Sequence, residues 1–327
     1  METVSLSLQN LKRAKDLSSL AEVLGVQPTT LSFLLYKLPT EHRYRRFTIP
    51  KANGGVREIC APEPRLKFVQ SQLSNLLLEI EQQLESVRKR ECILAHGFKK
   101  NLSIVSNAKN HRNRRFVFNV DLKDFFPSIN FGRVRGFFIK NRDFQLEPSV
   151  ATVIAQIACH ENMLPQGSPS SPIIANFVAN ILDIHLNRLA RKHHCTYTRY
   201  ADDLTFSTNK KAFPTAIARL TTSSFNGWEA GDELASRVSR AGFSLNPTKT
   251  RMQYKDSRQQ TTGIIVNTKI NVSVDYAKLT RSMCHHLFMD GVPYLIENDV
   301  IKPIKRPRLR GMLGHMVILP ANKGLQK

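Results

Sequence analysis

Residues 197–206 of this chain are Tyr-Thr-Arg-Tyr-Ala-Asp202-Asp203-Leu-Thr-Phe. Both flanks alternate apolar and polar side chains and are rich in Tyr, Thr and Phe, which predicts two strands joined by a hairpin turn at the two aspartates. Asp is also common in solvated turns, and that is the ordinary alternative for such a pair. Proteins usually hold Mg²⁺ with one or two carboxylates plus substrate phosphates. The choice between a metal site and a solvated turn therefore depends on whether a third carboxylate and phosphate-binding groups occur elsewhere in the chain.

A third carboxylate follows another predicted strand. Residues 116–120, Phe-Val-Phe-Asn-Val, form a nearly continuous apolar run that is typical of a central buried strand, and Asp121 comes next. A buried carboxylate is costly without a partner, so this position indicates a functional site. A helix-sized segment separates Asp121 from Asp202, which allows both elements to be neighbours in one sheet. Such carboxylates can hold two Mg²⁺ ions about 4 Å apart, the arrangement used in nucleotidyl transfer.

The charge of the chain favours a polyanionic partner. Its 327 residues include 48 Lys and Arg against 26 Asp and Glu, a net charge of +22. Each phosphate neutralised by such a surface releases counterions, although a merely basic enzyme is the alternative. Interleaved Phe and Tyr favour nucleic acid over a membrane. The basic clusters are Arg43, Arg45 and Arg46; Arg88, Lys89 and Arg90; Arg112, Arg114 and Arg115; and Lys302, Lys305, Arg306, Arg308 and Arg310.

The cysteines and the N-terminus predict a cytoplasmic protein with no membrane contact. The five cysteines are scattered and no pair has metal-ligand spacing, which fits a reduced compartment. The N-terminus lacks the apolar core of a signal peptide, and no apolar run reaches membrane length.

Two further segments supply candidate ligand contacts. A β-hairpin is predicted over 44–62, with an Asn-Gly-Gly turn at 53–55, and its Lys51 and Arg57 can project towards one ligand. At 164–172, Gly167 allows a close backbone approach to a ligand, and Ser171 suits the N-cap of a long helix.

The remaining segments are less informative. Residues 16–38 predict two helices separated by a glycine. These helices either bind DNA or pack on the body of the protein, and their apolar character favours packing. The polar stretch 209–232 has few signals and is expected to contain a variable loop. Residues 242–246 predict a short strand, and the last fifty residues a helical, basic region.

Several motifs together resemble the reverse transcriptases, and specifically the bacterial retron group, over about residues 45–290. They occur in the family's order and comprise a first catalytic motif, a substrate-positioning loop and a metal-binding box: Asp121-Leu-Lys-Asp124-Phe-Phe126, Leu164-Pro-Gln-Gly-Ser-Pro169 and Tyr200-Ala-Asp-Asp203. Asn107-Ala-Lys-Asn-His111 is similar to the Asn-Ala-x-x-His signature of retron enzymes. Thr261-Thr262-Gly263 stands where that group has Val-Thr-Gly, which is a departure at one position.

The resemblance implies a role for each matching residue. Phe126 would be the steric gate that excludes a ribose 2′-OH, with a core phenylalanine as the alternative. Lys249 would donate a proton to the pyrophosphate, with a solvated lysine as the alternative. The implied catalytic residues are Asp121, Asp202, Asp203 and Lys249, and the three aspartates would bind two Mg²⁺ ions. The implied nucleotide-binding residues are Lys51, Arg57, Phe126, Gln166 and Gly167, and the implied RNA-binding residues are Asn107, His111, Thr262 and Gly263.

The resemblance also implies an α+β, right-hand polymerase fold without an RNase H domain. Its expected parts are an N-terminal helical segment (1–42), fingers (43–115), a palm with an antiparallel sheet and a fingers insertion around 135–165 (116–272), and a short helical thumb with a basic tail (273–327).

The implied function is RNA-directed DNA synthesis with dNTPs. A retron-type enzyme would copy part of its cognate non-coding RNA from an RNA 2′-OH, give a branched RNA–DNA hybrid (msDNA) and serve antiphage defence. A separate effector protein and a host RNase H are the other implied partners. Two alternatives stay open: a scaffold or antitoxin that restrains an effector while bound to nucleic acid, and the reverse transcriptase of another mobile element.

Overall fold

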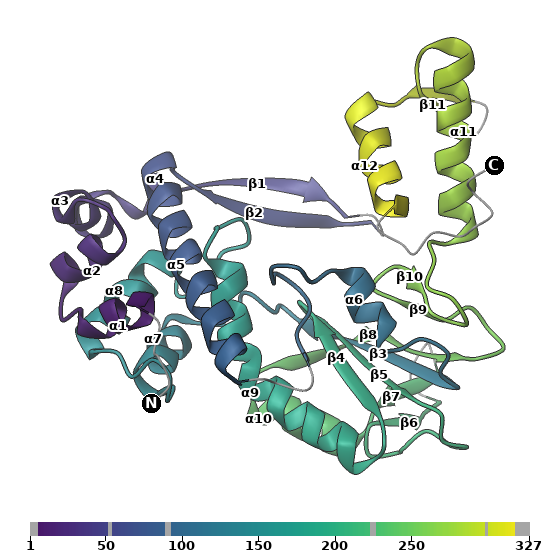
Figure 1. Cartoon of the computed structure of the whole chain (residues 1–327), viewed down its shortest axis with the longest axis horizontal. Coiled ribbons are helices and arrows are strands. Elements are labelled where there is room, and N and C mark those ends of the chain that lie inside the picture. The colour runs from purple at the N-terminus through teal and green to yellow at the C-terminus, as the bar shows by residue number, and fades with distance from the viewer. Residues whose placement is uncertain (1–5, 52–53, 89–92, 223–226, 298–299, 318–327) are drawn as a thin grey trace. The chain divides into compact units, whose positions relative to one another are not determined.

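Four strands form the sheet that carries the predicted carboxylates, in the spatial order β4–β5–β3–β8 (Figure 1). They are β3 (Phe116–Lys123), β4 (Thr196–Tyr200), β5 (Asp203–Thr208) and β8 (Ser244–Tyr254). Strand β5 pairs antiparallel with β3 and with β4. The central strands β3 and β5 are largely buried, as the apolar run before Asp121 predicts.

The computed structural model describes residues 6–51, 54–88, 93–222, 227–297 and 300–317. The chain divides into two compact units. The first comprises Met1–Lys100, Leu122–His185 and Ser236–Leu245, and the second comprises Asn101–Asp121, Leu186–Ala235 and Asn246–Lys327. Helices and sheets occur in both units, so the α+β class expected from the sequence is confirmed. Among the residues that the structure describes, no helix is both long enough and apolar enough to cross a membrane.

The N-terminal helices pack on the first unit. Leu11, Leu20, Leu31 and Leu34 are fully buried. This burial supports packing on the protein body, and not DNA binding, as the role of this segment. An Asp16–Ser19 capping box begins its second helix. The Arg43 guanidinium donates to the Leu35 and Leu38 carbonyl oxygens at the end of the segment. The elements are α1 (Leu6–Arg13), α2 (Leu17–Val23), α3 (Pro28–Ser32), the π-helix η1 (Phe33–Lys37) and α4 (Thr40–Arg43).

The rest of the first unit combines a two-stranded hairpin with long helices. The hairpin is β1 (Tyr44–Pro50) with β2 (Val56–Pro62), as predicted, although Asn53 of its turn lies outside the described residues. The helices are α5 (Pro64–Arg88), α7 (Phe131–Lys140), α8 (Pro148–Ala158) and α9 (Ser171–Lys192), of which α9 continues into the second unit.

The second unit places small elements around the sheet. Helix α6 (Ile104–Lys109) begins at a Ser103–Ser106 capping box and lies against β4 and the short pair β9 (Gln260–Thr261) and β10 (Ile264–Ile265) (Figure 1). The apolar side chains beneath it form one core cluster: Val105, Ala108, Val117, Ile264, Val266, Ile270 and Val272.

Three sequence predictions differ from the structure. The stretch 209–232 contains the hairpin β6 (Ala218–Leu220) and β7 (Trp228–Ala230), and it also contains the start of α10 (Asp232–Arg240). The strand predicted at 242–246 is β8, which continues to Tyr254. The C-terminal region has the expected helices α11 (Val274–Asp290) and α12 (Arg306–Val317), with the hairpin β11 (Tyr294–Glu297) and β12 (Val300–Pro303) between them.

Candidate active site

The paired aspartates lie at the turn of the β4–β5 hairpin, beside the end of β3. Tyr200 pairs with Asp203 across the hairpin, and Asp203 pairs with Asp121 on the neighbouring strand. Directly opposed residues project from the same face of a sheet, so the carboxylates of Asp121 and Asp203 emerge together. The sequence predicted this adjacency from a strand pattern and a turn pattern that lie far apart in the chain.

The turn itself has an unusual backbone. Ala201 has a φ of +56°, in the left-handed region that disfavours a residue with a Cβ. The Arg199 side chain is fully buried beneath it and donates from Nη1 to the Ala201 carbonyl oxygen at 3.1 Å. The protein thus holds a strained backbone at the residue that precedes Asp202, as is common at functional sites.

The carboxylates repel one another in this arrangement. Burial, together with the charges of Asp202 and Asp121, raises the pKa of Asp203 to about 6, against the attraction of Lys249 and Arg251. Asp121 is itself buried, with 4% of its surface exposed. A cation at this position would lower the energy of all three carboxylates, which is the condition that a metal-binding site meets.

Strand β8 supplies the nearest positive charge. Lys249 Nζ lies 2.9 Å from Asp121 Oδ2, and Asn246 Nδ2 donates to Asp121 Oδ1 at 3.4 Å. Partial burial pulls the pKa of Lys249 down, but its hydrogen bond to Asp121 and the nearby carboxylates raise it above the usual value overall. The sequence prediction included Lys249 and missed Asn246, because residues three positions apart on a strand are not expected to share a face.

The donor set fits Mg²⁺ as a partly protein-bound ion. Within the described part of the chain, no group of three or more His, Cys, Asp or Glu side chains is arranged to hold a metal ion. An ion bound by Asp121, Asp202 and Asp203 would therefore complete its coordination with other oxygens. Mg²⁺ commonly does so, because it keeps waters or binds substrate phosphates beside one or two carboxylates.

The predicted nucleotide-binding residues lie in the first unit. Ile49 pairs with Arg57 in the β1–β2 hairpin, and Lys51, two positions after Ile49, continues the pairing through its N–H to the Gly55 carbonyl oxygen. Alternation along a strand puts Lys51 and Arg57 on the same face, which supports their common ligand as a prediction.

The loop before α9 docks on β2. The Cys60 N–H donates to the Gln166 carbonyl oxygen at 2.7 Å, and Gly167 has a φ of +121°. A Cβ on Gly167 would lie 2.9 Å from the Cys60 carbonyl oxygen, so the close approach that this glycine permits is to a neighbouring strand. Ser171 is the first residue of α9, and its hydroxyl donates to the Pro165 carbonyl oxygen.

Phe126 differs from its neighbour in burial. Phe125 is buried, with 4% of its surface exposed, and stacks on Phe243. Phe126 is half-buried and packs against Phe98 and Phe125 at ring-centroid distances of 6.0 and 5.4 Å. The core position is thus taken by Phe125, which leaves the gate assignment of Phe126 as a prediction.

The predicted RNA-binding residues divide into two kinds. Asn107 and His111 have 0% exposure, and their polar atoms bond to other side chains of the protein, so any effect on RNA recognition must be indirect. Thr262 and Gly263 form a turn in which both residues have positive φ. The Thr262 hydroxyl accepts a 3.5 Å hydrogen bond from Asn107.

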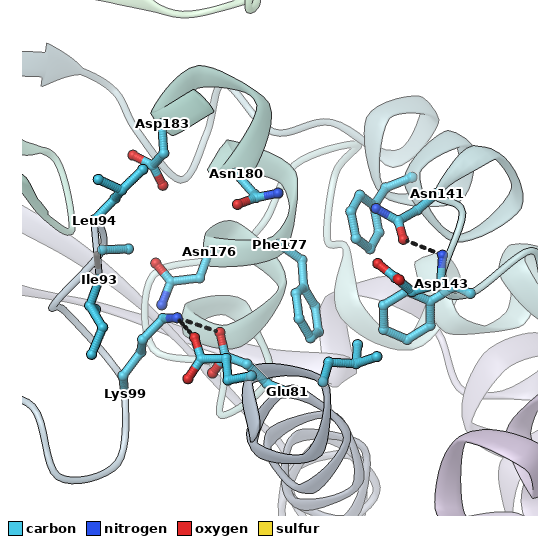
Figure 2. A pocket seen from close by; sticks show the side chains of 15 residues that line it. Glu81, Ile93, Leu94, Lys99, Asn141, Asp143, Asn176, Phe177, Asn180 and Asp183 are labelled. Carbon is cyan, nitrogen blue, oxygen red and sulfur yellow. Dashed lines mark hydrogen bonds and ion pairs between the residues drawn. The ribbon is translucent and has the colours of Figure 1, made fainter. Parts of the chain in front are cut away.

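The first unit also contains a cavity of about 170 Å³ that holds none of the predicted site residues. Figure 2 shows Asn176, Phe177, Asn180 and Asp183 projecting from α9 on one side of it. On the other side Lys99 forms ion pairs with Glu81 and Glu85 of α5. The Lys99 charge is thus neutralised by carboxylates within the cavity wall, which also includes Asp143 and Asp183.

Comparisons with known proteins show which family this sequence resembles. A family model described as "Reverse transcriptase (RNA-dependent DNA polymerase)" matches residues 49–276. The chain is 36% identical to the retron Mx65 reverse transcriptase of Myxococcus xanthus over 286 residues, 81% of this chain and 61% of that protein. It is 30% identical to the retron Ec86 reverse transcriptase of Escherichia coli over 294 residues, 88% of this chain and 83% of that protein.

Two further matches cover about half the length of the other protein. The retron Mx162 reverse transcriptase of M. xanthus is 34% identical, and the match spans 53% of its length. Among solved structures, a telomerase from Candida tropicalis in complex with a fragment of telomeric RNA has 12% identity and a TM-score of 0.48, over 85% of this chain and 53% of that one. That likeness is too distant to support a conclusion.

Proposed function

This chain belongs to the reverse transcriptase family and to its bacterial retron group, and on that premise we propose that it synthesises DNA on an RNA template. The observation that carries the proposal is the pairing of Asp121 with Asp203 beside Asp202 on one face of the sheet. The reverse transcriptase domain implies a two-metal mechanism, and we propose these three aspartates as the ligands of two Mg²⁺ ions. When bound, such ions neutralise the phosphates and polarise the reacting oxygens.

The chain's own residues would orient and neutralise the substrate. Lys51 and Arg57, on one face of their hairpin, suit the triphosphate of a dNTP. Lys249 Nζ, which donates a hydrogen bond to Asp121 Oδ2, would suit proton donation to the pyrophosphate. Gln166 would position the nucleotide beside Gly167, and Phe126 would exclude a 2′-OH.

The division into parts is proposed as the family implies: fingers over 43–115, palm over 116–272 and thumb from 273. The thumb is supported by α11, α12 and the hairpin between them. Its charge suits the phosphates of a structured RNA, since A-form helices are recognised mainly by backbone and 2′-OH contacts. Its basic residues include Lys278, Arg281, Lys302, Lys305, Arg306, Arg308 and Arg310.

The finer proposal is that the template is a cognate non-coding RNA primed from its own 2′-OH. The product would be msDNA, a branched RNA–DNA hybrid, with antiphage defence as its role and a separate effector and a host RNase H as partners. The similarity to the retron Ec86 and Mx65 enzymes supports this choice over another mobile element.

Analysis of nucleic acid that copurifies with the protein tests the finer proposal. The expected result is a DNA strand joined to RNA, whose size falls after treatment with a 2′,5′-debranching enzyme. Unbranched DNA synthesised only from added primers would overturn the retron assignment and leave the polymerase assignment standing. A protein partner that is lost after nuclease treatment would support the scaffold role as well.

A further inference from the structure

We propose that Asn107 and His111 are positioning residues for the catalytic carboxylates, which they serve by fixing the β4–β5 hairpin through side chains on the same face of the sheet. The buried polar network that carries this inference consists of Asn107, His111, Thr198, Ser207 and Thr262, all within the second unit. The inference rests on the proposed polymerase function and deepens it.

The network holds both strands of the hairpin at once. His111 Nε2 lies 2.7 Å from the Thr198 hydroxyl on β4, and Nδ1 lies 2.7 Å from the Ser207 hydroxyl on β5. The Thr198 hydroxyl donates to Asn107 Oδ1 at 2.5 Å. Because the Thr198 proton is used there, Nε2 must donate to Thr198, and in the neutral ring Nδ1 accepts from Ser207. Hydrogen bonds are directional, so this pattern fixes the hairpin more narrowly than apolar packing does.

The strand register connects the network to the catalytic residues. Thr198 pairs with Thr205, which in turn pairs with Asn119. This row of three residues lies two positions along the strands from the row of Tyr200, Asp203 and Asp121. Both rows lie on the same face, because side chains two positions apart on a strand point the same way. A shift of Thr198 or Ser207 would therefore move the turn that carries Asp202 and Asp203.

A second, partly buried chain of hydrogen bonds runs from Thr205 and Asn119 to the short strand β9. Asn119 Nδ2 donates to the Thr205 hydroxyl at 3.0 Å, and Gln253 Nε2 on β8 donates to Asn119 Oδ1. The Gln260 N–H then donates to Gln253 Oε1 at 2.6 Å. Both chains end at residues 260–262, since Asn107 Nδ2 donates to the Thr262 hydroxyl. The turn that we expect to meet RNA is thus connected to the catalytic sheet by two routes.

Burial separates this role from direct RNA binding. Asn107, His111, Thr198 and Ser207 all have 0% exposure, so none offers an atom to a phosphate or a base edge. The apolar cluster around Val105 and Val117 already packs α6 against the sheet. What the polar side chains add is a single defined geometry, as fully satisfied buried networks do.

Thr198→Val tests the proposal, since it removes the hydroxyl and keeps the shape of the side chain. Thr198→Ser restores the hydroxyl, and Thr208→Val is the matched control: Thr208 is equally buried on β5, but its hydroxyl donates to the His194 carbonyl oxygen outside the network. Ser207→Ala is a milder second variant in case Thr198→Val does not fold. The assay is dTTP incorporation on oligo(dT)-primed poly(rA) over a Mg²⁺ titration, with Tm measured with and without Mg²⁺.

The proposal predicts a fall in kcat of about tenfold for Thr198→Val, a several-fold higher Mg²⁺ concentration at half-maximal rate, and a smaller rise in Tm on adding Mg²⁺. Ser207→Ala should move the same quantities less. Thr198→Ser and Thr208→Val should stay within about twofold of the wild type.

Two results would overturn the proposal: unchanged kcat and Mg²⁺ dependence in Thr198→Val and Ser207→Ala, or equal losses in Thr208→Val. A wild type that makes no DNA would instead refute the proposed function, and the Mg²⁺-induced Tm rise would still decide the positioning role.

Discussion

Replacing Asp203 by Asn should stabilise the metal-free protein while it abolishes DNA synthesis. The reason is the crowding of carboxylates: burial, Asp202 and Asp121 raise the pKa of Asp203 from 3.8 to about 6. Each unit of such a shift corresponds to about 1.4 kcal/mol. Ionised Asp203 therefore costs the fold at most about 3 kcal/mol, and the nearly isosteric, neutral Asn removes that cost.

The pH dependence gives the sign of the effect. Because the folded-state pKa is raised, the folded protein holds this proton while the unfolded chain loses it, as the pH rises from about 4 to about 6. The wild type loses the corresponding stability across that window, and Asp203→Asn does not. The variant should exceed the wild type by up to about 3 kcal/mol at pH 8, and the difference should shrink towards pH 4.5.

Urea unfolding in EDTA at pH 8 and at pH 4.5 measures this difference. Asp256→Asn, at an exposed position of the same unit, is the control for loss of a carboxylate and should change stability by less than about 0.5 kcal/mol. Added Mg²⁺ should raise the stability of the wild type more than that of Asp203→Asn. A variant no more stable than the wild type at pH 8, or one with the same gain at both pH values, would refute the reasoning.

Three further predictions concern specificity and stability. Phe126→Ala should incorporate ribonucleotides more readily than the wild type in a primer-extension assay, and unchanged discrimination would remove the gate assignment. Ala201→Gly should keep or raise the free energy of unfolding by up to about 1 kcal/mol, whereas Ala201→Val should lower it by about 1–2 kcal/mol, because φ here is +56°; equal effects would contradict a strained turn. Arg133→Ala should cost about 2–3 kcal/mol in urea unfolding, since its guanidinium donates to the Ala241 and Gly242 carbonyl oxygens and lies over the Phe243 ring, and a loss below about 0.5 kcal/mol would contradict this.

Strong local patterns predicted the catalytic sheet well. The apolar run before Asp121 and the alternation around Asp202 are properties of single segments, and both strands form as expected. The sequence did not predict β6 and β7, because each has three residues and no hydrophobic period. Tertiary contacts determine whether such short segments form strands. The strand predicted at 242–246 continues through Pro247 to Tyr254, because β8 is an edge strand and a residue there can lack an N–H without breaking a pair.

The burial of Asn107 and His111 could not be predicted from sequence. Asn107 lies on the short helix α6 and His111 in the turn that follows it, and polar residues at such positions are usually exposed. Their partners Thr198 and Ser207 follow about ninety positions later, and only the fold brings them together. A motif typical of an RNA-binding enzyme can therefore act through the protein's own strands.

DNA synthesis by the double variant Asp202→Asn with Asp203→Asn tests the central claim most directly. Wild type, double variant and the Asp256→Asn control are compared for Mg²⁺-dependent dNTP incorporation on a primed RNA template, at equal concentrations of folded protein. The paired carboxylates predict a loss of at least about a thousandfold in the double variant alone. Incorporation by the double variant at the wild-type rate would contradict the account.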